Sequence, residues 1–302
     1  MKLISSTKVL YIKLGVAGAY EEECINENKI MIDYKEIDHN FCLNGDWKQV
    51  GKQIKELGWG SANNHLRQLK DFYESGEGVL WITFYANKLW WCFAENKVYS
   101  YLDGKKYKKV VEKWRDTNIA NEKLLMGKLS GKLLKTQGYR GTICNVEDEK
   151  YVINKINNQK NKDVEMVEAS LSELKSSLVN LIKNLWWDDF EVLIDLIFHN
   201  LGWKRVGALG KTQKIIDLEL SNPLTNETII VQIKSKSSQV EFDKYKEELK
   251  NIEADRKYYI VNSSPEFKTN SKDDTVKLYF NDDVADLVIK SGLINWVINK
   301  AT

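Results

Sequence analysis

Residues 215–234, IIDLELSNPLTNETIIVQIK, decide the fold of the second half of this 302-residue chain. Two aliphatic runs, Ile215–Leu220 and Thr228–Lys234, flank a polar segment that contains Pro223. Runs of this length and composition, separated by turn-forming residues, are typical of adjacent strands in one sheet. We therefore expect a pair of strands here.

The side chains of these two strands fall on two unlike faces, because the side-chain period of a strand is two. On the first strand Asp217 and Glu219 share one face, and on the second Gln232 and Lys234 do. Adjacent strands can thus place Asp217 beside Gln232 and Lys234. The apolar residues of the opposite face are Ile216, Leu218, Leu220, Ile229, Val231 and Ile233.

An acid, an amide and a lysine at one place suit a divalent-metal phosphodiester site. Carboxylate and amide oxygens are ligands that Mg²⁺ accepts, and the bound ion lowers the pKa of a coordinated water. The lysine can orient that water and stabilise the charged transition state. A solvated strand face, with Lys234 simply paired to Asp217, is the alternative interpretation of the same residues.

The elements around the strand pair predict an α/β sandwich. A helix capped by Asp188 or Asp189 should run to about Leu201, with Gly202 as its stop. After the strand pair we expect a helix near 241–252, strands at 257–261 and 277–280, and a final helix over about 282–299. The order α-β-β-α-β-β-α does not repeat a βαβ unit.

At these residues the chain resembles a known family. FEVLIDLIFHNLGW, GALGKTQKIIDLELSNP and IIVQIKSKSS are similar to the Mrr-type branch of the PD-(D/E)xK nucleases, over about 188–238 and more loosely to the end. The resemblance implies catalytic roles for Glu191, Asp217, Gln232 and Lys234. It implies Mg²⁺, or Mn²⁺, held by Asp217, Gln232 and the backbone carbonyl of Ile233. Lys211 and Lys214, just before the site, are either phosphate contacts or surface lysines.

The first half reads as a compact, β-rich α+β domain over residues 1–147. Strands are expected at 8–14, 29–34, 79–84, 89–94 and 97–101, and helices at 47–57 and 62–73, the latter capped by Ser61. The polar segment 148–164 is the predicted linker, and 165–302 the nuclease domain, opening with an amphipathic helix to about residue 185. The fold class is thus two-domain α+β.

Aromatic residues crowd the segment LWITFYANKLWWCF at 80–93. One interpretation is a hydrophobic core filled by Trp81, Trp90 and Trp91. The other is a pocket that stacks a flipped or modified base, as in PUA/EVE-like domains, which this half loosely resembles through LGVAG, the aromatic hairpin and SGKLLKTQGYRGTI. Both interpretations stay open at this point.

The charge distribution favours DNA as the partner of the first half. The net charge of +2 divides into +6 for residues 1–164 and −4 for the remainder. Lys105, Lys106 and Arg140 are candidate phosphate contacts, and a solvated surface is the alternative. Only 5 of the 45 basic residues are arginine, which favours recognition by a pocket over bidentate reading of guanine in the major groove.

These patterns also exclude several classes. No apolar run is long enough for a membrane span or a signal peptide, and the 4 cysteines and 3 histidines form no zinc pattern. We expect a cytoplasmic protein with free thiols.

The leading hypothesis is a metal-dependent, modification-dependent restriction endonuclease of phage defence that acts on double-stranded DNA, as a homodimer because two strands need two active sites. The alternatives are a sequence-specific nuclease for unmodified DNA and a nucleic-acid-binding sensor with an inactive nuclease fold, which the neutral Gln232 keeps open.

Overall fold

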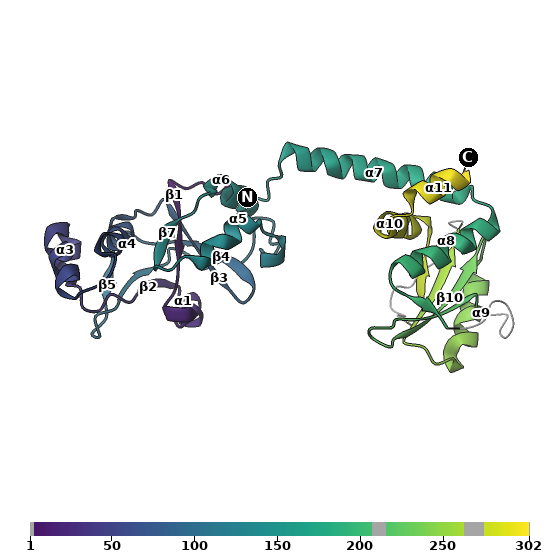
Figure 1. The fold of residues 1–302 in the computed structure, drawn as a ribbon, viewed down its shortest axis with the longest axis horizontal. Helices are drawn as coiled ribbons and strands as arrows, with labels where there is room; N and C mark the ends of the chain where they lie inside the picture. Colours follow the sequence, from purple (N-terminus) through teal and green to yellow (C-terminus); the bar gives the residue numbers. More distant parts are fainter. Residues whose placement is uncertain (1–2, 207–215, 263–274, 302) are drawn as a thin grey trace. The chain divides into compact units, whose positions relative to one another are not determined.

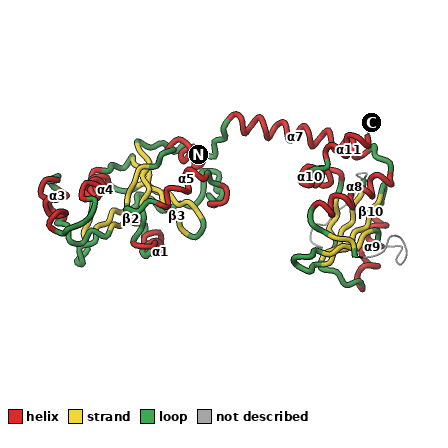
Figure 2. The backbone as a smooth tube through the Cα atoms, viewed as in Figure 1, coloured by secondary structure: helices red, strands yellow, loops and turns green. Residues whose placement is uncertain are grey.

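The computed structural model describes residues 3–206, 216–262 and 275–301 (Figure 1). It divides into two compact units, Met1–Asn161 and Lys162–Thr302. Both units combine helices with sheet, so the expected α+β class is confirmed. Figure 2 shows the strands of each unit gathered into their own group. No helix in the described ranges is long and apolar enough to cross a membrane.

The first unit is built on a mixed four-stranded sheet with the order β4-β3-β1-β7. β1 runs parallel to β3, and β3 and β4 form the aromatic hairpin, whose turn residues Ala86 and Asn87 both adopt positive φ. Apolar clusters cover both faces of this sheet. Its strands are β1 (Lys8–Ile12), β3 (Val79–Tyr85), β4 (Lys88–Phe93) and β7 (Ile143–Asn145).

A second sheet of the first unit has the order β2-β6-β5, and short helices surround both sheets. The strands are β2 (Lys29–Ile32), β5 (Tyr99–Ser100) and β6 (Lys106–Lys109). The α-helices are α1 (Glu21–Asn26), α2 (His39–Leu43), α3 (Trp47–Glu56), α4 (Ala62–Glu74), α5 (Gly131–Leu134) and α6 (Glu149–Ile156). The helices expected at 47–57 and 62–73 are confirmed, but Ser61 lies in the left-handed region and makes no side-chain cap.

The structure corrects the linker predicted at 148–164. Asp148 caps α6, and Val152 and Ile156 of this helix are buried in the core of the first unit. Asn157 then exchanges two hydrogen bonds of 2.8 Å with the backbone of Ile4. Only two positions of this short helix face the core, so most of its residues are polar. This polar composition is why the sequence suggests a linker. The next helix, α7 (Lys162–Lys183), opens the second unit.

The second unit contains a five-stranded sheet with the order β12-β11-β10-β9-β8. β9 runs antiparallel to both of its neighbours, β8 and β10, whereas β10, β11 and β12 are parallel. The strands are β8 (Lys204–Arg205), β9 (Leu218–Ser221), β10 (Thr228–Lys234), β11 (Arg256–Val261) and β12 (Lys277–Tyr279).

Helices cover both faces of this sheet. One face packs against α7, α8 (Trp187–Asn200), α10 (Asn281–Ser291) and α11 (Ile294–Ala301), and the other against α9 (Gln239–Glu248). The single final helix expected over 282–299 is wrong. It is broken at Gly292, whose φ of 74° ends α10. Gly202 follows α8 as expected, but no Asp side chain caps that helix.

Candidate nuclease site

The Asp217 carboxylate lies at the entry of β9 and is held by β10. Its Oδ2 accepts a 2.6 Å hydrogen bond from the backbone N–H of Ile233 and another from the side-chain amide of Gln232. The Asp217 N–H donates in turn to the Val231 carbonyl at 3.0 Å. The predicted neighbourhood of Asp217 and Gln232 is therefore present, and the strand register produces it.

Lys234 and Glu191 lie within electrostatic reach of this carboxylate. Burial of the carboxyl group raises the pKa of Asp217 above its ordinary value, against the opposing effects of the Ile233 N–H and the Lys234 charge. Burial also raises the pKa of Glu191 on α8, assisted by the negative charges of Asp217 and Asp188 and opposed by Lys234. Asp217 and Gln232 are thus in contact, while Glu191 and Lys234 interact with Asp217 electrostatically. Burial is the main cause of both raised pKa values.

The residues at this position would offer a magnesium ion few protein oxygens, so the ion would keep several water molecules. Within the described residues no three His, Cys, Asp or Glu side chains are grouped for a metal. A hard cation here would depend on the Asp217 carboxylate, the Gln232 amide oxygen and a backbone carbonyl, with Glu191 close by. Few carboxylates and retained waters are how Mg²⁺ is usually held. Glu219 is exposed, as expected for a strand residue that faces solvent. Lys211 and Lys214 lie outside the described residues.

The tryptophans of the aromatic hairpin are mostly core residues. Trp81 is 0% exposed and packs on Phe72, and Trp91 is 3% exposed with its Nε1–H bonded to the Thr117 carbonyl. Neither offers a face to a base, so their assignment as base-binding residues is corrected to core. Trp90 is partly exposed, but Lys88 lies over its ring and its Nε1–H donates to the Tyr85 carbonyl.

The basic residues proposed for DNA contact have different environments. Lys106 is 1% exposed, and its ammonium donates to the carbonyls of Tyr34 and Ile37, so its assignment as a phosphate contact is wrong. Lys105 is partly exposed, is paired with Asp103 at 2.9 Å and lies over the ring of Tyr20. Arg140 is exposed.

Sequence reasoning missed a second aromatic group, which we call the Trp59 cluster: Tyr34, Trp59 and His65. The Trp59 and His65 rings are 5.1 Å apart, and the Tyr34 hydroxyl shares a 3.1 Å hydrogen bond with His65 Nδ1. Trp59 and His65 are partly exposed. Tyr34 also bonds to Thr142, two residues after Arg140. Trp59 and His65 are close in the sequence, but Tyr34 comes from a distant segment, and no local motif joins the three.

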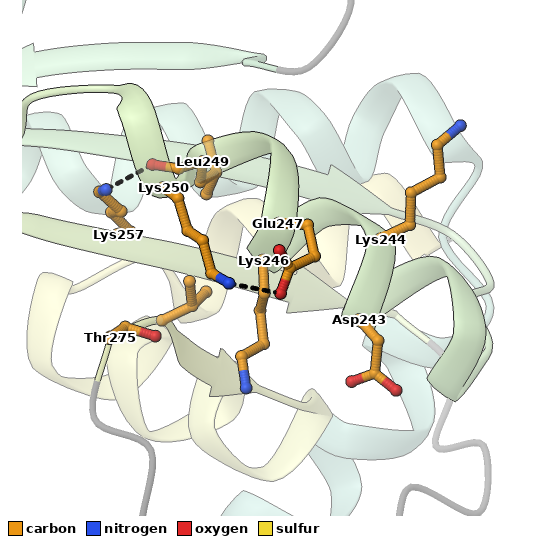
Figure 3. Close-up of a pocket in the computed structure, with 9 residues that line it drawn as sticks. Asp243, Lys244, Lys246, Glu247, Leu249, Lys250, Lys257 and Thr275 are labelled. Carbon is orange, nitrogen blue, oxygen red and sulfur yellow. Dashed lines mark hydrogen bonds and ion pairs between the residues drawn. The ribbon is translucent and has the colours of Figure 1, made fainter.

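A separate pocket of about 580 Å³ lies along α9 (Figure 3). Lysines dominate its lining, but Lys250 is paired with Glu247 at 2.7 Å, and Lys257 donates to the Leu249 carbonyl at 2.6 Å. None of its lining residues belongs to the Asp217 site. The cations are therefore tied to neighbouring acceptors, and we assign the pocket no function.

The second unit is thus a sheet between helices, with an acid, an amide and a lysine gathered on two adjacent strands. No protein-family model matches the chain, and no curated protein matches it by sequence. Among solved structures, the DNA modification-dependent restriction endonuclease AspBHI aligns with a TM-score of 0.31 and 12% identity, over 91% of this chain and 80% of that one. Similarity at this level carries no argument about function, which is drawn below from the residues of this chain.

Proposed function

We propose that this chain is a metal-dependent DNA endonuclease, whose second unit hydrolyses phosphodiester bonds and whose first unit selects the DNA. The observation that carries the proposal is the contact of Asp217 with Gln232 and Ile233, with Lys234 and Glu191 in electrostatic reach. This combination supports the proposal because it would offer a metal ion oxygen ligands beside a cationic side chain.

The residues divide the proposed reaction between them. Mg²⁺ or Mn²⁺ bound here supplies an activated water and offsets phosphate charge. Asp217 and Gln232 hold the ion by their oxygens, and the Ile233 carbonyl is a further candidate ligand. Lys234, exposed beside them, orients the attacking water and stabilises the negative charge that develops on the phosphate. Glu191, with its raised pKa, is suited to accept or hold a proton at the edge of the site.

Modification dependence is the finer part of the proposal. We assign the selection step to the first unit because it carries the positive net charge and a partly exposed aromatic group, the Trp59 cluster. Exposed aromatic rings are the surfaces on which a flipped base stacks. Cleavage of both strands requires two active sites, so we expect a homodimer on DNA.

A cleavage assay tests the function directly. The full chain is incubated with Mg²⁺ or Mn²⁺ and matched duplexes that carry cytosine, 5-methylcytosine or 5-hydroxymethylcytosine. We expect metal-dependent cutting that differs among the three. Equal cutting of all three would support a nuclease that does not require modified DNA. No cutting of any duplex with either metal would favour the second candidate, a sensor with an inactive nuclease fold, which the neutral Gln232 suggests.

The Trp59 cluster gives a prediction of its own. Replacing Trp59 by Ala should reduce preference for the modified duplex about tenfold or more, because base–aromatic stacking contributes about 1–3 kcal/mol per base. The measurement is the ratio of cleavage rates on modified and unmodified duplexes, with thermal unfolding as the folding check. Trp90→Ala is the matched control, since the Trp90 ring is covered by Lys88. Loss of preference in Trp90→Ala alone would indicate that the base is recognised by the β3–β4 hairpin and not by the Trp59 cluster.

A further inference from the structure

One stretch of the first unit carries only positive charge. No Asp or Glu occurs from residue 123 to residue 146. Within this stretch we define residues 126–141 as the basic segment, whose exposed cations are Lys128, Lys132, Lys135 and Arg140. The one ion pair that these cations form with a described residue is the contact of 3.9 Å between Lys132 and Glu147. The charge of the basic segment is therefore available to an anionic partner.

The backbone of the basic segment is fixed by the fold. Leu133 is 1% exposed and belongs to the core of the first unit. The Met126 N–H donates to the Asn87 carbonyl at 3.0 Å, and the Ser130 N–H donates to the Tyr151 hydroxyl at 2.9 Å. The cations thus extend from a backbone that is positioned before any partner binds, which lowers the entropic cost of binding.

The end of the basic segment contacts the helix that carries His65. The Tyr139 hydroxyl donates to Asn64 Oδ1 at 2.9 Å and accepts from the Arg67 guanidinium at 2.9 Å. Asn64 and Arg67 come just before and just after His65 on α4. The basic segment and the Trp59 cluster are therefore neighbouring parts of the first unit.

Three glycines of the basic segment are not required by the fold, namely Gly127, Gly131 and Gly138. At each position a Cβ atom would meet no atom within 4 Å, and φ lies outside the left-handed range. Gly60, at the edge of the Trp59 cluster, is the one other described glycine with both properties. By contrast, a Cβ atom on Gly141 would lie 2.8 Å from Gln68 Oε1, so packing requires that glycine.

Glycine at positions that the fold leaves open suits the close approach of a partner. Glycine loses more conformational freedom on folding than alanine does, so these positions lower the stability of the unit. A backbone without side chains allows a ligand to come close to it. Phosphate oxygens accept hydrogen bonds from backbone N–H groups and from Lys and Arg side chains. Open glycines interspersed with cations therefore match the sugar–phosphate backbone of a nucleic acid.

We propose that the basic segment and Gly60 form the surface on which the first unit binds the phosphates of duplex DNA. The cations neutralise phosphates, and the open glycines let the DNA backbone approach the chain. This surface holds the duplex beside the Trp59 cluster, to which base selection is assigned. The inference rests on the proposed function in taking DNA as the partner.

A glycine variant tests the close approach. The full-length chain carries Gly127→Ala, Gly131→Ala and Gly138→Ala together, and its affinity for a fluorescent duplex is measured by anisotropy without metal. We expect affinity to fall about tenfold, a loss of about 1.4 kcal/mol, because the methyl groups hold the phosphates away. Thermal unfolding should occur at the wild-type temperature or higher. Gly76→Ala, at an exposed glycine outside the segment whose Cβ would make an ordinary 3.6 Å contact, is the matched control.

A lysine variant tests the charge of the same surface. Lys132→Ala combined with Lys135→Ala should reduce the slope of log affinity against log salt by about two phosphate contacts. Lys97→Ala combined with Lys113→Ala removes two exposed lysines outside the segment and should keep the wild-type slope.

The outcomes separate this inference from the proposed function. Wild-type affinity in the glycine variant, or an equal change of slope in the two lysine variants, overturns the surface while leaving the proposed nuclease intact. A lower unfolding temperature in the glycine variant shows that the fold needs these glycines, and overturns the argument for close approach. A wild-type chain that binds no duplex overturns the proposed function and the inference together.

Discussion

Asp217→Asn and Lys234→Ala should each lower DNA cleavage about a thousandfold while leaving DNA binding unchanged. Asn keeps an oxygen that accepts from Ile233 and Gln232, so the local hydrogen bonds survive while the charge that attracts a cation is lost. Lys234→Ala removes the cation beside the attacked phosphate. Single-turnover cleavage at saturating enzyme, with binding measured separately, checks both variants.

The stability of Asp217→Asn provides a second readout. The pKa of Asp217 is raised on folding, so above its unfolded pKa the folded chain bears a cost for keeping this carboxylate charged. Near neutral pH the amide removes that cost, and Asp217→Asn should unfold at the same temperature as the wild type or higher. A lower unfolding temperature together with lost cleavage would mean that Asp217 serves the fold instead of the chemistry.

Two neighbours supply matched controls for the site variants. Glu219→Gln removes an exposed acid from the same strand, and Lys236→Ala removes an exposed lysine two residues beyond Lys234. Both should cut at the wild-type rate. If Lys236→Ala loses as much activity as Lys234→Ala, the effect comes from general positive charge near the DNA, and the assignment of Lys234 to the reacting phosphate is wrong.

The strand pair of the candidate site could be predicted because local pattern and tertiary environment agree there. Leu218 and Leu220 alternate with polar residues along β9, and the structure buries them with Ile229 in the cluster beneath α7 and α8. A shift of one residue would turn this set to the opposite face, so the register is strongly determined. Once the register is set, Asp217 and Gln232 meet without any further information.

The Trp59 cluster could not be predicted in the same way. Trp59 and His65 lie just before and within α4, and Tyr34 comes from a distant segment. Their proximity depends on how α4 packs, which no local pattern records.

The lysine run at 105–109 shows where residue type misleads. Charge alone suggests a solvated, DNA-facing surface, but β6 places Lys106 and Lys108 on its inner face. Lys108 donates to the carbonyl and hydroxyl of Ser75, and burial lowers its pKa to about 8. The acceptors lie 33 to 72 residues away in the sequence, in segments whose carbonyls lack a strand partner. The two-residue period of a strand could have indicated that Lys106 and Lys108 share one face. Because lysine is usually exposed, the pattern does not suggest that this face is buried.

Lys106→Met is therefore expected to destabilise the first unit by about 2–3 kcal/mol, whereas Lys105→Met should change its stability by less than about 0.5 kcal/mol. Met fills a similar volume but leaves the carbonyls of Tyr34 and Ile37 without their donor. The loss is partly offset because the buried ammonium, whose pKa burial lowers, no longer has to be desolvated. Urea unfolding of the full chain, followed by a probe in the first unit, measures both variants.

For DNA binding we expect the reverse: Lys105 contributes to affinity and Lys106 does not. Lys105 is partly exposed, so its loss should reduce the slope of log affinity against log salt by about one phosphate contact. Lys106→Met, assayed where it remains folded, should leave that slope unchanged, because its ammonium is bonded inside the unit. A stable Lys106→Met chain with a reduced salt slope would contradict the buried position and return Lys106 to the DNA-binding surface. The two variants thus show, for each lysine, whether it stabilises the first unit or contacts DNA phosphate.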